Sequence, residues 1–214
     1  MSRSSISTCQ RFAASLAVAV LTALASAGAC AQGADPASAH IDILHRALIE
    51  TMKQGKQLGL KGRYDKLAPV LLETYDVPLM ARIAVGASWD SMPPPQQSRV
   101  VEAFWRMMVA TYASRFGEFS GERFDILQTM ERPPTGKIVK TRVTQSNGKT
   151  VSIYYLVRLA GGEWKVIDVF LDGTISELAN RRAEFTEILK SGGPDALIAS
   201  LRQQGDKLLA AGGG

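Results

Sequence analysis

Few side chains in this chain of 214 residues could carry out nucleophilic, acid-base or metal chemistry. Its two histidines, His40 and His45, lie in one segment with helical periodicity, where a spacing of five residues separates them by about 140° around the axis. Histidines on different faces of a helix cannot share a metal ion, so we expect both on the surface and predict no metal site. The sequence also has no G-x-S-x-G, H-E-x-x-H or phosphate-binding glycine motif.

Asp168 is the one acid whose position could support general-base catalysis. It lies in a strand-like segment, and alternation places it on the same face as Trp164, Val166 and Phe170. A carboxylate on an apolar face can have a raised pKa and act as a base. The alternative is a buried structural carboxylate that accepts hydrogen bonds from the backbone or from an arginine such as Arg182. We favour this second interpretation.

Residues 1–31 have the pattern of a secretory signal peptide. Arg3 and Arg11 accompany an apolar, alanine-rich run that is too short for a confident membrane span, which needs about 20 strongly apolar residues. The run ends in Ala29-Cys30-Ala31, a small-x-small cleavage site. We therefore expect export to the periplasm. Two alternatives stay open, namely lipidation of Cys30 and a retained N-terminal anchor.

Residues 32–214 are then expected to form a single domain without a thiol, because Cys9 and Cys30 both precede the cleavage site. Loss of Arg3 and Arg11 reduces the formal net charge from +5 to about +3. The excess is mild, and no basic run is interleaved with aromatic residues, so nucleic acid is excluded as a partner. A weakly basic surface could still bind an anionic membrane or an acidic protein.

The elements that would position these residues follow the order helices, strands, helices. Helical spacing covers residues 41–52, 64–75, 79–85, 96–118, 175–189 and 195–209, and alternation covers residues 123–132, 137–145, 150–160 and 163–172. Asn147-Gly148 and Gly161-Gly162 predict hairpins between successive strands. The predicted fold class is α+β. A curved antiparallel meander of about four strands packs against N- and C-terminal helices, in an NTF2-like cone with an apolar pocket.

Apolar side chains occur on both faces of the predicted strands, although only one face need contact a core. The segment at residues 150–160 places five apolar side chains on one face and two on the other. Six methionines after the signal peptide add flexible apolar side chains, which suit a cavity that adapts to its ligand. Two interpretations stay open: a ligand cavity, or a core together with a protein interface.

Several short segments also follow one another in an order typical of a known family. They are Tyr75-Asp76-Val77-Pro78, Phe104-Trp105-Arg106, Thr111-Tyr112-Ala113, Tyr154-Tyr155-Leu156, Gly162-Glu163-Trp164-Lys165-Val166-Ile167-Asp168, Asp172-Gly173-Thr174-Ile175-Ser176, Arg182-Ala183-Glu184-Phe185 and Gly193-Pro194-Asp195-Ala196-Leu197-Ile198. In this order they resemble the periplasmic lipid-carrier family of MlaC and the toluene-tolerance proteins. No single segment is specific, but the series covers most of the mature chain.

The resemblance implies a fold and a function. Proteins of this family are soluble periplasmic carriers that hold a phospholipid by its acyl chains between a sheet and helices. They exchange it with an inner-membrane ABC transporter complex and an outer-membrane lipoprotein complex. The resemblance therefore implies a monomeric carrier with no cofactor and no enzymatic activity.

One stretch, residues 172–185, looks more like a hopanoid-associated branch, the HpnM-like proteins. The phospholipid carriers tend to have an aromatic residue where this chain has Arg181. The implied ligand is thus either a two-tailed phospholipid or a rigid polycyclic hopanoid.

Residue type and predicted face give the expected pocket wall. Its members are Leu71, Tyr75, Ile83, Trp89, Phe104, Met108, Tyr112, Tyr155, Val157, Trp164 and Val166. Arg106, Arg142 or Arg158 could lie near a lipid head group. Two other hypotheses compete with a lipid carrier. One is an NTF2-like enzyme that uses Asp168 as a base, and the other is an envelope adaptor that binds proteins and no lipid.

Overall fold

Three helices open the described part of the chain, which covers residues 35–134 and 136–211 of the computed structural model. They are α1 (Pro36–Lys53), α2 (Gly55–Thr74) and α3 (Val77–Val85). Asp35 begins α1 by accepting a hydrogen bond from the Ala37 amide at 2.8 Å, as an N-cap does. The predicted signal peptide and the cleavage or lipidation near Cys30 lie outside the described residues.

Two longer helices follow the short 3₁₀ helix η1 (Gly86–Ser91). They are α4 (Pro94–Arg115), just before the sheet, and α5 (Glu177–Ala210), after it. The sequence predicts a break near Gly193, and the structure has a kink there, where Gly193 adopts a φ of 67° that side-chain-bearing residues rarely adopt. Ser176 caps α5 by accepting a hydrogen bond from the Ala179 amide at 2.9 Å.

The strands form one antiparallel meander. Their order in the sheet equals their order in the chain: β1 (Arg123–Arg132), β2 (Gly136–Thr144), β3 (Thr150–Ala160), β4 (Glu163–Leu171) and β5 (Ile175–Ser176). The four long strands and their hairpins are confirmed. The two-residue β5 was not expected, because the sequence reads as the start of a helix there.

A β-bulge in the β3–β4 pair corrects the predicted face of β4. Val166 lies opposite Val157, but Asp168 lies opposite Leu156, so the bulge between these pairs puts Val166 and Asp168 on different faces. Simple alternation, which grouped Asp168 with Val166, is therefore wrong here. Beyond the bulge, Val169 and Leu171 point to the inner face together with Tyr155 and Ile153, their partners on β3.

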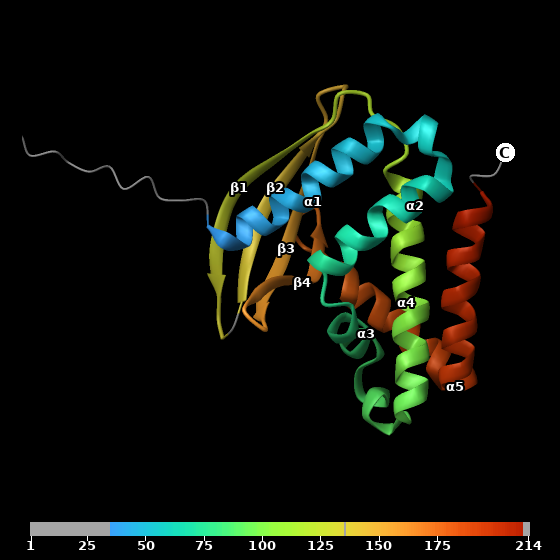
Figure 1. Ribbon diagram of the computed structural model, residues 1–214. Helices are drawn as coiled ribbons and strands as arrows, with labels where there is room; N and C mark the ends of the chain where they lie inside the picture. The colour runs from blue at the N-terminus through green and yellow to red at the C-terminus, as the bar shows by residue number, and fades with distance from the viewer. Residues whose placement is uncertain (1–34, 135, 212–214) are drawn as a thin grey trace, which may run out of the picture. The chain divides into compact units, whose positions relative to one another are not determined.

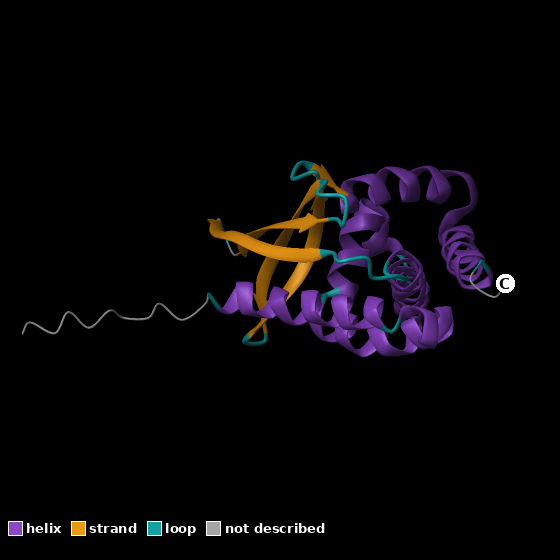
Figure 2. Ribbon diagram, turned by 90° about the horizontal axis from the view of Figure 1, so that it is seen from above, coloured by secondary structure: helices purple, strands orange, loops and turns teal. Residues whose placement is uncertain are grey.

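The helices pack on one face of the sheet, and the core lies between the two layers (Figures 1 and 2). Helix α4 lies in the middle of the helical layer and contacts α2, α3 and α5, so it buries side chains on more than one side. Helix α1 crosses the sheet near β1 and β2. No helix in the described ranges combines the length and apolar character needed to cross a membrane.

Candidate functional site

A cavity of about 140 Å³ lies between α4 and the inner face of the sheet. Helix α4 contributes one continuous stripe to its wall, since Phe104, Met108, Thr111 and Arg115 repeat at intervals of three or four residues. The remaining wall comes from Tyr75, which follows α2, from Met80 on α3, from β3 and β4, and from the first turns of α5. Segments far apart in the sequence thus enclose one apolar space.

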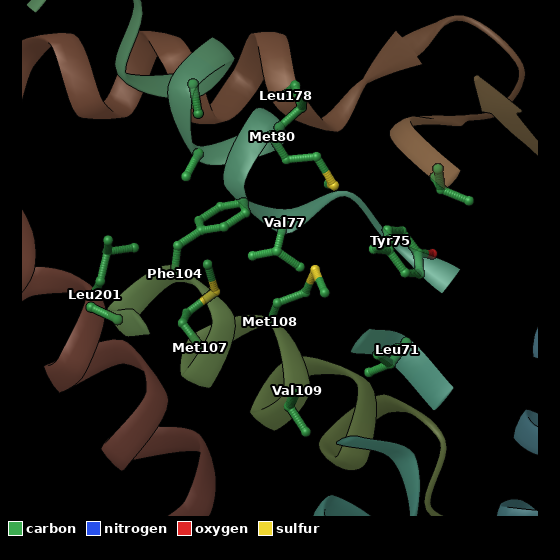
Figure 3. Packing of buried hydrophobic residues seen from close by; sticks show 14 of the residues in the cluster. Leu71, Tyr75, Val77, Met80, Phe104, Met107, Met108, Val109, Leu178 and Leu201 are labelled. Carbon is green, nitrogen blue, oxygen red and sulfur yellow. The ribbon is translucent and has the colours of Figure 1, made fainter. Parts of the chain in front are cut away.

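Methionine and aromatic side chains make up much of this wall. Met80 on α3 and Met108 on α4 point toward each other, and Phe104 and Leu178 lie beside them (Figure 3). Methionine is unbranched and has three rotatable bonds, so it can rearrange around ligands of different shape. The cavity can therefore change its form without movement of the backbone.

Tyrosine hydroxyls supply the buried polar atoms of the wall. The Tyr75 and Tyr112 hydroxyls share a hydrogen bond, and the Tyr155 hydroxyl lies 3.3 Å from His45 Nε2. Burial raises the pKa of Tyr75 and of Tyr155 well above the ordinary value, so both stay neutral. These groups can donate hydrogen bonds to a ligand, but they offer no nucleophile at neutral pH.

His45 is buried, which corrects the expectation that both histidines lie on the surface. It stacks on Phe124 with ring centroids 4.4 Å apart, and only 3% of its surface is exposed. His40 is half-buried, with Nε2 3.2 Å from the Thr74 carbonyl oxygen. In the part of the chain that the structure describes, no group of three metal-binding side chains comes together.

The buried His45 predicts a pH-dependent stability. Burial lowers its pKa from 6.5 to about 4, so between these values the unfolded chain binds a proton that the folded chain does not. The contribution of His45 to the free energy of unfolding is present in full above pH 6.5. It decreases by about 3 kcal/mol as the pH falls to 4. Urea unfolding from pH 4 to 7 should show this loss in the wild type and a smaller one in His45→Phe. Equal pH dependence in both proteins would refute the assignment.

Asp168 has a structural role, in agreement with the favoured interpretation, although its partners are a serine and the backbone and not an arginine. Its carboxylate accepts hydrogen bonds from Ser176 Oγ at 2.6 Å and from the Leu178 amide at 3.1 Å. These bonds attach the first turn of α5 to β4. Asp168 is also not among the residues that line the cavity.

Asp168→Ala should therefore destabilise the fold. We expect a loss of about 2–4 kcal/mol in the free energy of unfolding at pH 7, because the Ser176 hydroxyl and Leu178 amide lose a charged acceptor. Glu163→Ala is the control, since Glu163 lies on the same strand with a side chain that is 70% exposed, and it should change stability by less than about 0.5 kcal/mol. Equal stability of the two variants would contradict the role given to Asp168.

The structure brings part of the predicted pocket wall together. Tyr75, Phe104, Met108, Tyr112 and Tyr155 line the cavity. The other predicted residues do not line it: Leu71, Val157 and Val166 are buried in the core, and Ile83, Trp89 and Trp164 pack against that core with partial exposure. Leu71, labelled in Figure 3, belongs to the same buried cluster as Tyr75.

Sequence reasoning missed other wall residues, of which some had a signal. Helical spacing from Phe104 and Tyr112 leads to Met107 and Phe116, and alternation from Tyr155 leads to Ile153. Other wall residues had no signal in the sequence. These are Met80, Val169, Leu171 and Leu178, which reach the cavity through the bulge and through tertiary packing.

The charged side chains at the cavity also differ from those expected. Arg106, Arg142 and Arg158 form ion pairs with Asp206, Asp125 and Asp76, and none of these arginines lines the cavity. The charged residues that do line it are Arg115, Glu177 and Arg181. They come from the last turn of α4 and the first turns of α5.

The sequence pattern of the MlaC protein family matches residues 43–203, which is most of the chain and extends from within α1 to within α5. The chain belongs to the MlaC family. Among the relatives of this MlaC-family protein is the toluene tolerance protein ttg2D of Pseudomonas putida, which is 25% identical over 134 residues. That match covers 62% of this chain and 61% of the relative, less than two thirds of its length.

A solved structure has the same fold. It is the phospholipid-binding protein from Ralstonia solanacearum in complex with a phospholipid, with a TM-score of 0.72 and 21% sequence identity. The match covers 81% of this chain and 99% of that protein. The resemblance to the MlaC family is therefore confirmed, together with the α+β fold. The hopanoid-associated branch stays a prediction.

Proposed function

We propose that this MlaC-family protein is a lipid-binding carrier, and that the apolar cavity between α4 and the sheet holds the acyl chains of a phospholipid. The observation that carries the proposal is the cavity wall, which consists mainly of methionine, aromatic and aliphatic side chains and includes three charged residues. The description of the Ralstonia solanacearum protein as phospholipid-binding supports it.

Burial of apolar chains supplies the binding energy in this proposal. Each CH₂ group removed from water contributes about 0.8 kcal/mol, so about ten buried methylenes supply the roughly 8 kcal/mol that corresponds to micromolar affinity. The cavity, at about 140 Å³, is close in size to an engineered cavity that binds one benzene molecule. A two-tailed lipid therefore requires the wall to open, and Met80, Met107 and Met108 are the side chains that can move most readily.

We also propose that the protein works in the periplasm and shuttles lipid between the inner and outer membranes. The signal-peptide pattern of residues 1–31 and the family support this location. In this role the carrier would be a monomer that meets an inner-membrane ABC transporter complex and an outer-membrane lipoprotein complex. It would need no cofactor, metal or catalytic residue, because exchange of a lipid breaks no bond.

Lipid transfer between two vesicle populations tests the proposal. A protein-permeable membrane that retains vesicles separates donor vesicles with radiolabelled phospholipid from unlabelled acceptors. We expect label to reach the acceptors at a rate that rises with protein concentration, because only the carrier crosses. A rate no greater than that without protein would overturn the carrier role.

A hopanoid is the alternative ligand in the same experiment. The flexible methionines of the wall favour acyl chains, which bend to fit, over a rigid polycyclic molecule. Donor vesicles that contain both lipids should therefore lose phospholipid first. Selective transfer of hopanoid would instead assign the protein to the hopanoid-associated branch.

A further inference from the structure

The charges at the cavity are of both signs, and one of them is already neutralised. Arg181 donates a hydrogen bond to the Glu184 carboxylate at 2.9 Å, and Gln204 binds the same carboxylate at 2.8 Å. Arg181 is therefore held by residues of its own helix. Because Arg181 is already paired with Glu184, it adds little net charge to the binding site of a ligand.

Arg115 and Glu177 are different. Arg115 is exposed in the last turn of α4, and Glu177 is half-buried in the first turn of α5. Neither forms an ion pair within residues 35–134 and 136–211, with each other or with another side chain. Both nevertheless line the same cavity, so its wall contains a cation and an anion that are not paired with each other.

Tyr112 lines the same cavity as these two charged residues. Burial raises the pKa of Tyr112, the hydrogen bond with Tyr75 and the charge of Arg115 lower it, and the charge of Glu177 raises it again. Both charges thus act on the pKa of one buried hydroxyl in the cavity wall. Each charge also suits its position on its helix. A cation such as Arg115 stabilises a helix C-terminus, and an anion such as Glu177 stabilises a helix N-terminus.

We infer that Arg115 and Glu177 select a zwitterionic phospholipid, with Arg115 binding the phosphate and Glu177 binding the ammonium group of the head. This inference rests on the proposed lipid-carrier function. A guanidinium and a phosphate form strong charge-assisted hydrogen bonds, and so do a carboxylate and an ammonium group. A head group with a phosphate and no cation would leave Glu177 unpaired next to negative charge. This part of the cavity wall would therefore disfavour anionic lipids.

Competitive uptake tests the selection. Delipidated full-length mature protein is incubated with vesicles of equal phosphatidylethanolamine and phosphatidylglycerol, and the lipid bound to the re-isolated protein is measured by mass spectrometry. We expect the wild type to enrich phosphatidylethanolamine about fivefold, as one partly exposed charge pair allows. Glu177→Gln should bring the ratio close to one. Arg115→Gln should lower the uptake of both lipids, since both carry a phosphate.

Two controls show whether the lipid ratio depends on Glu177 itself. Glu187→Gln removes an exposed glutamate of the same helix and should keep the wild-type ratio. Thermal unfolding of each variant shows whether a change in the lipid ratio is accompanied by a loss of stability, which removal of the charge at the helix end can cause by itself. Equal amounts of the two lipids on the wild type, or an unchanged ratio in Glu177→Gln, would overturn the inference. Absence of both lipids from the wild type would instead overturn the carrier function itself.

Discussion

Thr111→Trp should lower the amount of phospholipid bound per protein by about tenfold or more, equivalent to a loss of at least about 1.4 kcal/mol in binding. Thr111 lines the cavity from the middle of α4 and is only half-buried, so a larger side chain there can fill the space at small cost to folding. Because the cavity measures about 140 Å³, an indole ring leaves little of it for an acyl chain. The measurement is lipid uptake by delipidated protein from vesicles.

Ser114→Trp is the matched control for this prediction. Ser114 lies one turn further along α4 and is exposed, so the same indole ring should leave uptake unchanged. Circular dichroism should show that both variants remain folded. Normal uptake by a folded Thr111→Trp protein would mean that the lipid does not enter this cavity.

Phe185→Ala should lower the free energy of unfolding by about 3–5 kcal/mol, the usual cost when a fully buried phenylalanine is truncated. Phe185 is 0% exposed and meets Phe104 edge to face, with ring centroids 6.1 Å apart and the rings at 90°. This pair joins α5 to α4 next to the cavity. Urea unfolding at pH 7 measures the effect.

Leu72→Ala is the comparison for that variant, because Leu72 is 61% exposed and should contribute less than about 0.5 kcal/mol. A loss below about 1 kcal/mol in Phe185→Ala would show that α4 and α5 are not held together by this contact. Since Phe104 also lines the cavity, we further expect Phe185→Ala to weaken lipid uptake in the protein that remains folded.

Local signals account for most of the predicted fold. The turn at Asn147-Gly148 and the turn at Gly161-Gly162 specify hairpins through glycines with positive φ, at 81° for Gly148 and 61° for Gly161. The cap at Ser176 and the break at Gly193 likewise depend on a few neighbouring residues. Such features are encoded within short segments, so a sequence is sufficient to predict them.

Features that depend on partners in space could not be predicted. The bulge in the β3–β4 pair reverses the faces of β4, and alternation alone cannot reveal an extra residue such as Ile167. His45 looked like a surface residue because its spacing from His40 excludes a shared metal, but spacing does not show that Phe124 and Tyr155 cover it. Both errors arise because a neighbouring strand decides the environment.

The residues of the candidate site likewise divide into those that the sequence predicts and those that depend on partners in space. Tyr75, Phe104 and Tyr155 could be chosen from residue type and face, and they line the cavity. Arg115 and Glu177 could not, because only the folded chain brings the end of α4 and the start of α5 to the wall of one cavity.

Native mass spectrometry of the protein purified from the periplasm without detergent tests the central claim most directly. If the chain is a phospholipid carrier, the spectrum should show protein plus one phospholipid, and organic extraction should release that lipid in stoichiometric amount. Thr111→Trp, purified in the same way, should show the mass of the protein alone. A wild-type protein with no lipid, or with only trace amounts, would contradict the proposal and favour an adaptor that binds proteins.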